Sequence, residues 1–152
     1  TFWQMGADTA TTYNNAFYIY NGSERVISID RSGKVGIGTN SPTLPLHVVS
    51  TSGMAVDRYN DSASGGYLML RHSRGSESSP TTVATDDELG KILFYGYNGS
   101  TFVNTAEIRA LGNGTVSGGN VPAALSFRTG STTTSTERMK ITSTGDVIIT
   151  LG

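Results

Sequence analysis

The sequence contains no cysteine and only two histidines, His47 and His72, among its 152 residues. The lack of cysteine excludes disulfide cross-links, thiolate metal sites and cysteine nucleophiles. Two imidazoles are too few for a histidine-rich metal site within one chain, and too few for most acid–base centres that use several histidines. We therefore expect no catalytic residues, no metal site and no cofactor.

Charged residues are also scarce, at 15% of the sequence against roughly 25% in an ordinary soluble domain. The 11 Lys and Arg nearly balance the 12 Asp and Glu, which gives a formal net charge of -1. This balance argues against a nucleic-acid partner and against a polybasic membrane-surface protein. No apolar run approaches the roughly 18 residues that a membrane helix needs, so we expect no membrane insertion. Glycine, serine and threonine (19, 18 and 21 residues) take the place of the missing charge.

Helical patterns are missing as well, because glycine or a Ser/Thr cluster interrupts nearly every window with helical apolar spacing. Residues 85–89 are acidic enough for one helical turn at most, and Gly90 ends it. Strand patterns are abundant, and the sequence predicts an all-β fold of short antiparallel hairpins. The expected strands cover residues 16–20, 25–29, 46–50, 54–59, 67–72, 92–95, 102–109, 123–129, 139–142 and 146–151.

Three Asn-Gly pairs lie beside these strands, at Asn21-Gly22, Asn98-Gly99 and Asn113-Gly114. Asn-Gly accepts positive φ at both positions at low cost, as a type I′ hairpin turn requires. We therefore expect a type I′ turn at Asn21-Gly22 and the same device at the other two pairs.

A short pattern occurs twice in the chain. Residues 24–37 read ERVISIDRSGKVGI, and residues 137–149 read ERMKITSTGDVII. With one gap allowed, both contain E-R-apolar, an isoleucine, two polar residues and [ST]-G-x-V-x-I. Each copy is expected to form a strand, a tight turn at Ser/Thr-Gly and a second strand, and to close one of two sequential modules.

The two modules are expected to meet at residues 39–45, because Pro42 and Pro45 prevent this stretch from being a central strand. Residues 1–45 then form an N-terminal β-hairpin module, and residues 46–152 form a C-terminal β-rich module. His47 follows the boundary between two apolar residues of an expected strand. It is expected to be a hydrogen-bonded, partly buried residue.

Other motifs have plain structural explanations. The glycines of residues 33–39 do not fit a phosphate-binding loop, because Lys34 precedes Gly36 and Gly38 and does not follow the last glycine. They indicate strands in close approach at a crowded axis. Asp86-Asp87-Glu88 lacks the spacing of a calcium loop and is expected to be a solvated loop. The run Arg-His-Ser-Arg at 71–74 either contacts an anionic group such as a phosphate or uronate, or is a basic strand end that faces water or pairs with a carboxylate.

Residues 26–48, VISIDRSGKVGIGTNSPTLPLHV, resemble the I-D-x-x-G-x-V-G-I-G-T-x-x-P-x-x-x-L-x-V signature of bacteriophage tail fibres and tailspikes. That signature is widespread upstream of the self-cleaving chaperone domain that trimerises such fibres. Residues 2–23 and 89–147 look like shaft and tip modules of the same class. The second copy of the repeat departs from the signature, because residues 145–150 read GDVIIT in place of V-G-I-G-T.

The resemblance implies an elongated, intertwined parallel homotrimer of β-prism or β-sandwich-like fibre modules, with strands exchanged between subunits. The implied partners are two further copies of this chain, neighbouring fibre or tail proteins, and a glycan or outer-membrane protein of the host surface. The implied location is the virion, outside the cell. Small residues and glycines independently suit chains that pack closely around a three-fold axis.

In such a fibre, recognition of the host falls to exposed loops. The two longest turn-rich segments are residues 72–90 and 112–122. The candidate receptor contacts within them are His72, Arg74, Glu77, Asp86, Asp87, Asn113 and Asn120.

Two alternatives stay open. A tailspike that degrades polysaccharide needs a pair of carboxylates facing a groove. A purely structural shaft needs no ligand. The carboxylates that are available for the first alternative are Asp57, Asp61, Asp86, Asp87, Glu88 and Glu107.

Overall fold

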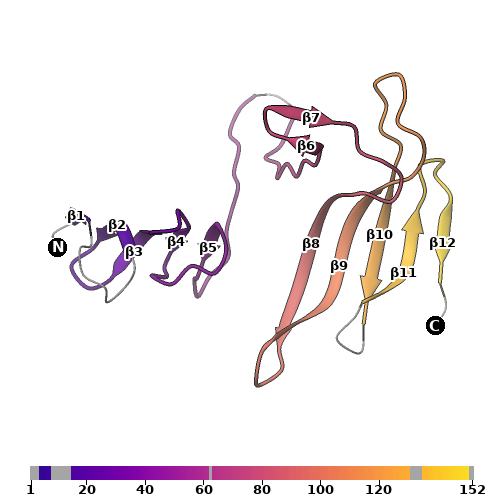
Figure 1. Ribbon diagram of the computed structural model, residues 1–152. Coiled ribbons are helices and arrows are strands. Elements are labelled where there is room, and N and C mark those ends of the chain that lie inside the picture. The colour runs from indigo at the N-terminus through magenta and orange to yellow at the C-terminus, as the bar shows by residue number, and fades with distance from the viewer. Residues whose placement is uncertain (1–3, 8–14, 62, 131–134, 151–152) are drawn as a thin grey trace. The chain divides into compact units, whose positions relative to one another are not determined.

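The computed structural model describes residues 4–7, 15–61, 63–130 and 135–150. Within these ranges the regular secondary structure consists of strands alone, which confirms the all-β fold (Figure 1). None of the described residues forms a helix that is long and apolar enough to span a membrane. The chain divides into two units, residues 1–65 and 66–152.

The first unit is built on one five-stranded sheet with the order β1-β2-β3-β4-β5. Its neighbours are antiparallel except for β4 and β5, which are parallel. β5 lies beyond the module boundary expected at residue 45, yet it pairs with β4. The strands are β1 (Gln4–Gly6), β2 (Asn15–Tyr20), β3 (Arg25–Asp30), β4 (Val35–Ile37) and β5 (Leu46–Val48).

The glycines after β3 allow the chain to fold tightly back on itself. A Cβ at Gly36 would lie against the carbonyl oxygen of Thr39, which also accepts a 2.8 Å hydrogen bond from the Ser28 hydroxyl. Gly38 has a φ of +69°, and a Cβ there would lie against the carbonyl oxygen of Val49. Close backbone approach within one chain therefore explains both glycines.

The second unit contains a second five-stranded sheet, with the order β12-β11-β10-β9-β8, and a separate hairpin of β6 and β7 (Figure 1). All of its strand pairs are antiparallel. The strands are β6 (Arg74–Ser76), β7 (Ser79–Thr81), β8 (Glu88–Tyr97), β9 (Phe102–Gly112), β10 (Ala123–Thr129), β11 (Thr136–Ile141) and β12 (Val147–Ile149).

The repeated sequence pattern forms the same hairpin twice, as predicted. In the first copy the Gly33 amide donates to the Asp30 carbonyl at 3.0 Å, and in the second the Gly145 amide donates to the Thr142 carbonyl at 3.0 Å. Both glycines have positive φ, +81° and +90°. When Gly33 is aligned with Gly145, Arg25 rather than Glu24 falls opposite Glu137. The one-residue gap between the two copies therefore lies before the turn, in β3. The pairing of β3 with β2 also contains a bulge there.

The predicted type I′ turn at Asn21-Gly22 is wrong. Positive φ occurs at Gly22 but not at Asn21, whereas type I′ needs it at both central residues. The Asn21 side-chain oxygen instead accepts hydrogen bonds from the amides of Ser23 (3.0 Å) and Glu24 (2.9 Å). The same two contacts recur at Asn98. The asparagine thus closes the loop with its side chain, from the position before the two central residues.

Two of the predicted strands do not form. Residues 54–59 and 67–72 have no strand assignment, although their apolar side chains remain. Met54 is 72% exposed and Leu68 is 68% exposed. A strand needs a neighbouring strand for its backbone hydrogen bonds, and no described segment of this chain pairs with either stretch. The predicted turn at residues 85–89 is confirmed at 85–86.

One face of the first sheet is entirely apolar. Residues that pair directly across neighbouring strands share a face, and this register separates the two faces cleanly. The opposite face carries Tyr18, Ser28 and His47, and His47 is half-buried, with the Thr43 amide 3.4 Å from its Nδ1, as predicted. The apolar face consists of Met5, Phe17, Ile19, Ile27, Ile29, Val35, Ile37, Leu46 and Val48.

The second sheet repeats this division. Its polar face is covered by its own ion pairs, such as Arg128 with Glu107 at 2.6 Å, and by the hydrogen bond from the Ser126 hydroxyl to Glu137 at 2.7 Å. Glu107 is only 7% exposed, whereas Ile92 on the other face is 46% exposed. The apolar face consists of Ile92, Phe94, Ala106, Ile108, Ala110, Leu125, Phe127, Met139, Ile141, Val147 and Ile149.

Candidate functional site

Three connecting segments of the second unit meet at one end of its sheet, which we call the loop end. Because the strands are antiparallel, β8, β10 and β12 begin where β9 and β11 finish. The long β9–β10 loop and the β11–β12 turn therefore share this end (Figure 1). The Ser143 amide donates to the Asn113 side-chain oxygen at 3.0 Å, and the Thr85 hydroxyl donates to the Gly114 carbonyl at 3.1 Å.

The predicted loop 72–90 is more ordered than expected. It contains the β6–β7 hairpin and the first residues of β8. Within it, Asp86 has a φ of +67°, the one positive φ among the described non-glycine residues. The segment that follows β7 returns to the sheet, where the Asp86 amide donates to the Gly112 carbonyl at 2.8 Å. The two predicted recognition segments are therefore joined by backbone and side-chain contacts.

Arg74 and Asp87 are held by each other. Arg74 Nε donates to Asp87 Oδ2 and Nη2 donates to Oδ1, each at 2.7 Å, and the Ala84 amide also donates to Oδ2 at 2.8 Å. The hydrogen bond from Arg74, with that from Ala84, lowers the pKa of Asp87 to about 2. The same pairing raises the pKa of Arg74. Both side chains therefore fix the β6–β7 hairpin to the following loop.

We expect this pair to weaken only in strong acid. The folded pKa of Asp87 is lowered, to about 2, so its stabilising effect is complete above the unfolded value of about 3.9. It is lost as the pH falls through the folded value. The carboxyl carbon shift of Asp87 in an NMR titration should therefore have a midpoint near pH 2. In an Arg74→Ala variant the midpoint should move upward, and a midpoint near pH 4 in the unaltered protein would contradict the pairing.

His72 and Glu77 lie together at a polar hollow of about 470 Å³. Both side chains are exposed. The hollow also includes Arg71, Ser73 and Pro80. Arg71 belongs to the basic run 71–74 but not to the predicted contacts. The basic run was the signal in the sequence for Arg71 as a lining residue. Pro80 had no such signal, because it reaches the hollow only through the β6–β7 hairpin, where it pairs with Gly75.

The two asparagines of the β9–β10 loop have different roles. Asn113 is engaged twice by Ser143, at its side-chain oxygen and at its carbonyl. The predicted hairpin turn at Asn113-Gly114 is wrong, because the Asn113 amide pairs with the Pro122 carbonyl across a longer loop. Asn120 is exposed and pairs with Ser117 at the loop tip. The tip carries consecutive positive φ values at residues 118 and 119, and both residues are glycines.

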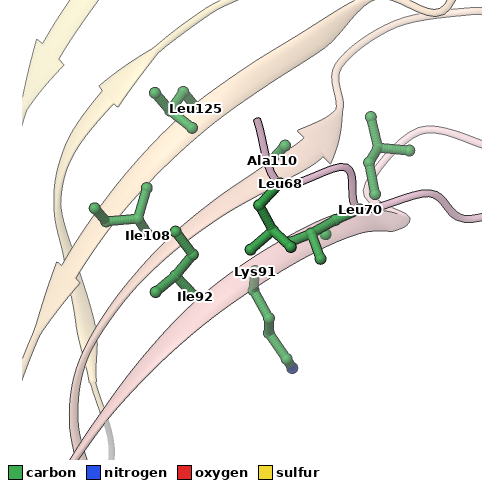
Figure 2. Close-up of a pocket in the computed structure, with 9 residues that line it drawn as sticks. Leu68, Leu70, Lys91, Ile92, Ile108, Ala110 and Leu125 are labelled. Atoms are coloured by element: carbon green, nitrogen blue, oxygen red, sulfur yellow. The ribbon is translucent and has the colours of Figure 1, made fainter. Parts of the chain in front are cut away.

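A second surface lies on the apolar face of the same sheet. Leu68 and Leu70 of the unpaired segment 67–72 lie beside Ile92, Ile108 and Leu125, around a hollow of about 290 Å³ (Figure 2). A Cβ at Gly90 would lie 2.8 Å from Leu70 Cβ, so this contact needs glycine there. The two leucines cover only one corner of the face, and Phe94, Val147 and Ile149 remain among its exposed residues.

No model of a known protein family and no curated protein matches this chain. The resemblance to tail fibres therefore rests on residues 26–48 and on the similar segments around them. Among the described residues, no group of three or more His, Asp or Glu side chains is placed to hold a metal ion.

Proposed function

We propose that this chain is a virion structural protein, a segment of a phage tail fibre that assembles as a parallel homotrimer and attaches to the host through its loop end. The observation that carries the proposal is the uncovered apolar face on each of the two sheets. An antiparallel sheet in water normally packs one face on a core. Within each unit, the described residues form no second layer over this face.

Further copies of the same chain are the simplest way to cover the apolar faces of the two sheets. In a closed cyclic assembly every copy presents the same face in the same way, so no apolar face is left open.

Strand exchange between copies accounts for the two unpaired segments. Residues 54–59 and 67–70 have strand-like sequences and exposed apolar side chains, and no described segment of the chain pairs with either of them. A neighbouring copy supplies both the partner and the burial. The glycine- and serine-rich composition, with few charges, suits chains that pack closely around a common axis.

The loop end is the recognition surface in this proposal. It gathers the two longest loops of the second unit, and exposed loops on a rigid scaffold are where binding residues concentrate. Three copies in one trimer raise the avidity of weak single sites by a factor of about 10² to 10⁴.

The paired carboxylates of the second unit give little support to the alternative of a polysaccharide-degrading tailspike. Glu88 accepts hydrogen bonds from Lys91 at 2.7 Å and from Arg109 at 2.8 Å, and these contacts lower its pKa. Asp87 and Glu107 are paired with arginines. A general acid needs a carboxyl that keeps its proton near neutral pH, and the lowered pKa of Asp87 and of Glu88 opposes this role.

The lack of cysteine allows a clean test of the recognition surface. A Ser117→Cys variant places a single thiol at the tip of the β9–β10 loop, and Ser100→Cys places one at the opposite end of the same sheet. Both serines are exposed. Each thiol is coupled to a bulky polyethylene glycol, and binding of the assembled protein to a panel of bacterial cells is measured by flow cytometry.

We expect the label at residue 117 to reduce cell binding at least about tenfold, because it covers the loop end of every copy. The label at residue 100 should leave binding unchanged, and both variants should keep the oligomeric mass of the parent. Equal binding by the two labelled proteins would point to a structural shaft and would contradict the recognition role.

A further inference from the structure

The polar hollow beside the β6–β7 hairpin has a chemistry of its own. Its volume, about 470 Å³, lies within the range of about 300 to 1,000 Å³ for small-molecule sites. Its lining combines a guanidinium, an imidazole, a hydroxyl and one carboxylate on a tight hairpin. The residues are Arg71, His72, Ser73, Glu77 and Pro80.

The two arginines of the basic run are in different states. Arg74 donates hydrogen bonds to both carboxylate oxygens of Asp87. Among the residues that the structure describes, Arg71 has no ion pair and no side-chain hydrogen bond. An exposed guanidinium with its donors unused suits bidentate recognition of a carboxylate or phosphate. Arg71 is thus available to a ligand, and Arg74 is a positioning residue.

The other polar groups narrow the ligand further. His72 offers a ring N–H in either neutral tautomer, and Ser73 offers a hydroxyl that both donates and accepts. Glu77 offers only acceptor oxygens, which suit sugar hydroxyls. A bare polyanion would meet repulsion from Glu77, whereas a ligand with one anionic group and several hydroxyls satisfies all four side chains.

We propose that this hollow binds an acidic saccharide, whose carboxylate or phosphate faces Arg71 and His72 and whose hydroxyls face Glu77 and Ser73. The inference rests on the proposed function, because it names the receptor chemistry that the loop end recognises. The hairpin holds the site in shape through the Arg74–Asp87 pair.

Calorimetric titration of the assembled full chain tests the site. The probes are a uronate-containing oligosaccharide, the same oligosaccharide with its carboxyl groups reduced to alcohols, and a saccharide that bears a phosphate monoester. We expect the reduced form to bind at least about tenfold more weakly than the uronate form, because it loses the charge-assisted hydrogen bonds. Comparison of uronate and phosphate probes identifies which anion the hollow prefers.

Arg71→Ala should weaken binding of the preferred acidic probe at least about tenfold. Arg31→Ala removes the same charge from an exposed turn residue of the first unit that does not line the hollow, and it should bind like the parent. Glu77→Gln removes the negative charge but keeps an amide acceptor, so it should bind the acidic probe more tightly. Equal affinities for the acidic and reduced probes, or unchanged binding by Arg71→Ala, would overturn the site.

The two proposals fail in different ways. If the Ser117 label blocks cell binding while Arg71→Ala leaves saccharide affinity unchanged, recognition at the loop end stands and the acidic-saccharide site falls. If neither labelled protein loses cell binding while Arg71→Ala loses saccharide binding, the hollow is a saccharide site and the attachment role falls.

Discussion

Replacing Ile92 by aspartate is expected to abolish assembly of the chain. Ile92 lies on the apolar face of the second sheet, opposite Ile108, and it is 46% exposed in the single chain. In the proposed trimer the face is covered, so each copy would bury an unpaired carboxylate. Burial of such a charge costs several kcal/mol after relaxation, about 3 or more per copy. The variant should sediment as monomer or aggregate, which analytical ultracentrifugation measures.

Leu93→Asp is the matched control. Leu93 is the next residue along β8 and faces the polar side, opposite Glu107, with a similar exposure of 37%. In an isolated chain Leu93→Asp should be tolerated no better than Ile92→Asp, because both side chains already contact water and the new carboxylate at residue 93 lies opposite Glu107. Only a partner on the apolar face separates them. If both variants keep the mass of the parent, the apolar face is not the assembly surface.

Replacing Gly38 by alanine is expected to destabilise the first unit by about 2 to 4 kcal/mol. Two costs add at this position. Its φ of +69° is unfavourable for any residue with a Cβ, and the Cβ would lie against the Val49 carbonyl oxygen. The turn that brings β5 back beside β4 would have to open. Urea unfolding at fixed protein concentration, followed by tyrosine fluorescence, measures the loss.

Two further glycines separate the causes. Gly33 also has positive φ, +81°, but nothing lies within 4 Å of an added Cβ, so Gly33→Ala should cost only about 1 kcal/mol. Gly53 has neither constraint. Gly53→Ala should therefore leave the stability of the first unit unchanged or raise it by at most about 1 kcal/mol. A Gly38→Ala variant no less stable than Gly33→Ala would show that the Val49 contact is unimportant.

The sequence predicts those elements whose pattern and partner lie close together in the chain. Residues 123–129 form β10 with the predicted bounds, and the turns at Gly33 and Gly145 form as the repeat implies. Local alternation and a glycine with positive φ are enough for such hairpins. Residues 54–59 and 67–72 carry equally strand-like sequences, yet no strand forms, because pairing depends on a neighbour that the segment itself does not encode.

The candidate site was predictable as a region but not as a set of contacts. Charge and turn composition located the segments 72–90 and 112–122. They did not show that Arg74 and Asp87, thirteen residues apart, form an ion pair with each other. They also did not show that Arg71 is left without such a pair among the described residues. Asn113 likewise turns inward to Ser143. Residue type shows what a side chain is able to bind, whereas the fold decides which side chains are already bound.

The most direct test of assembly through the apolar faces is the mass of the folded protein in solution. Sedimentation equilibrium at micromolar concentration, with circular dichroism on the same sample, measures both mass and folding. We expect a β-rich species with three times the 16.0 kDa of one chain. A β-rich, cooperatively unfolding species of 16.0 kDa would show that each apolar face is stable in water without a partner, and it would contradict the trimer.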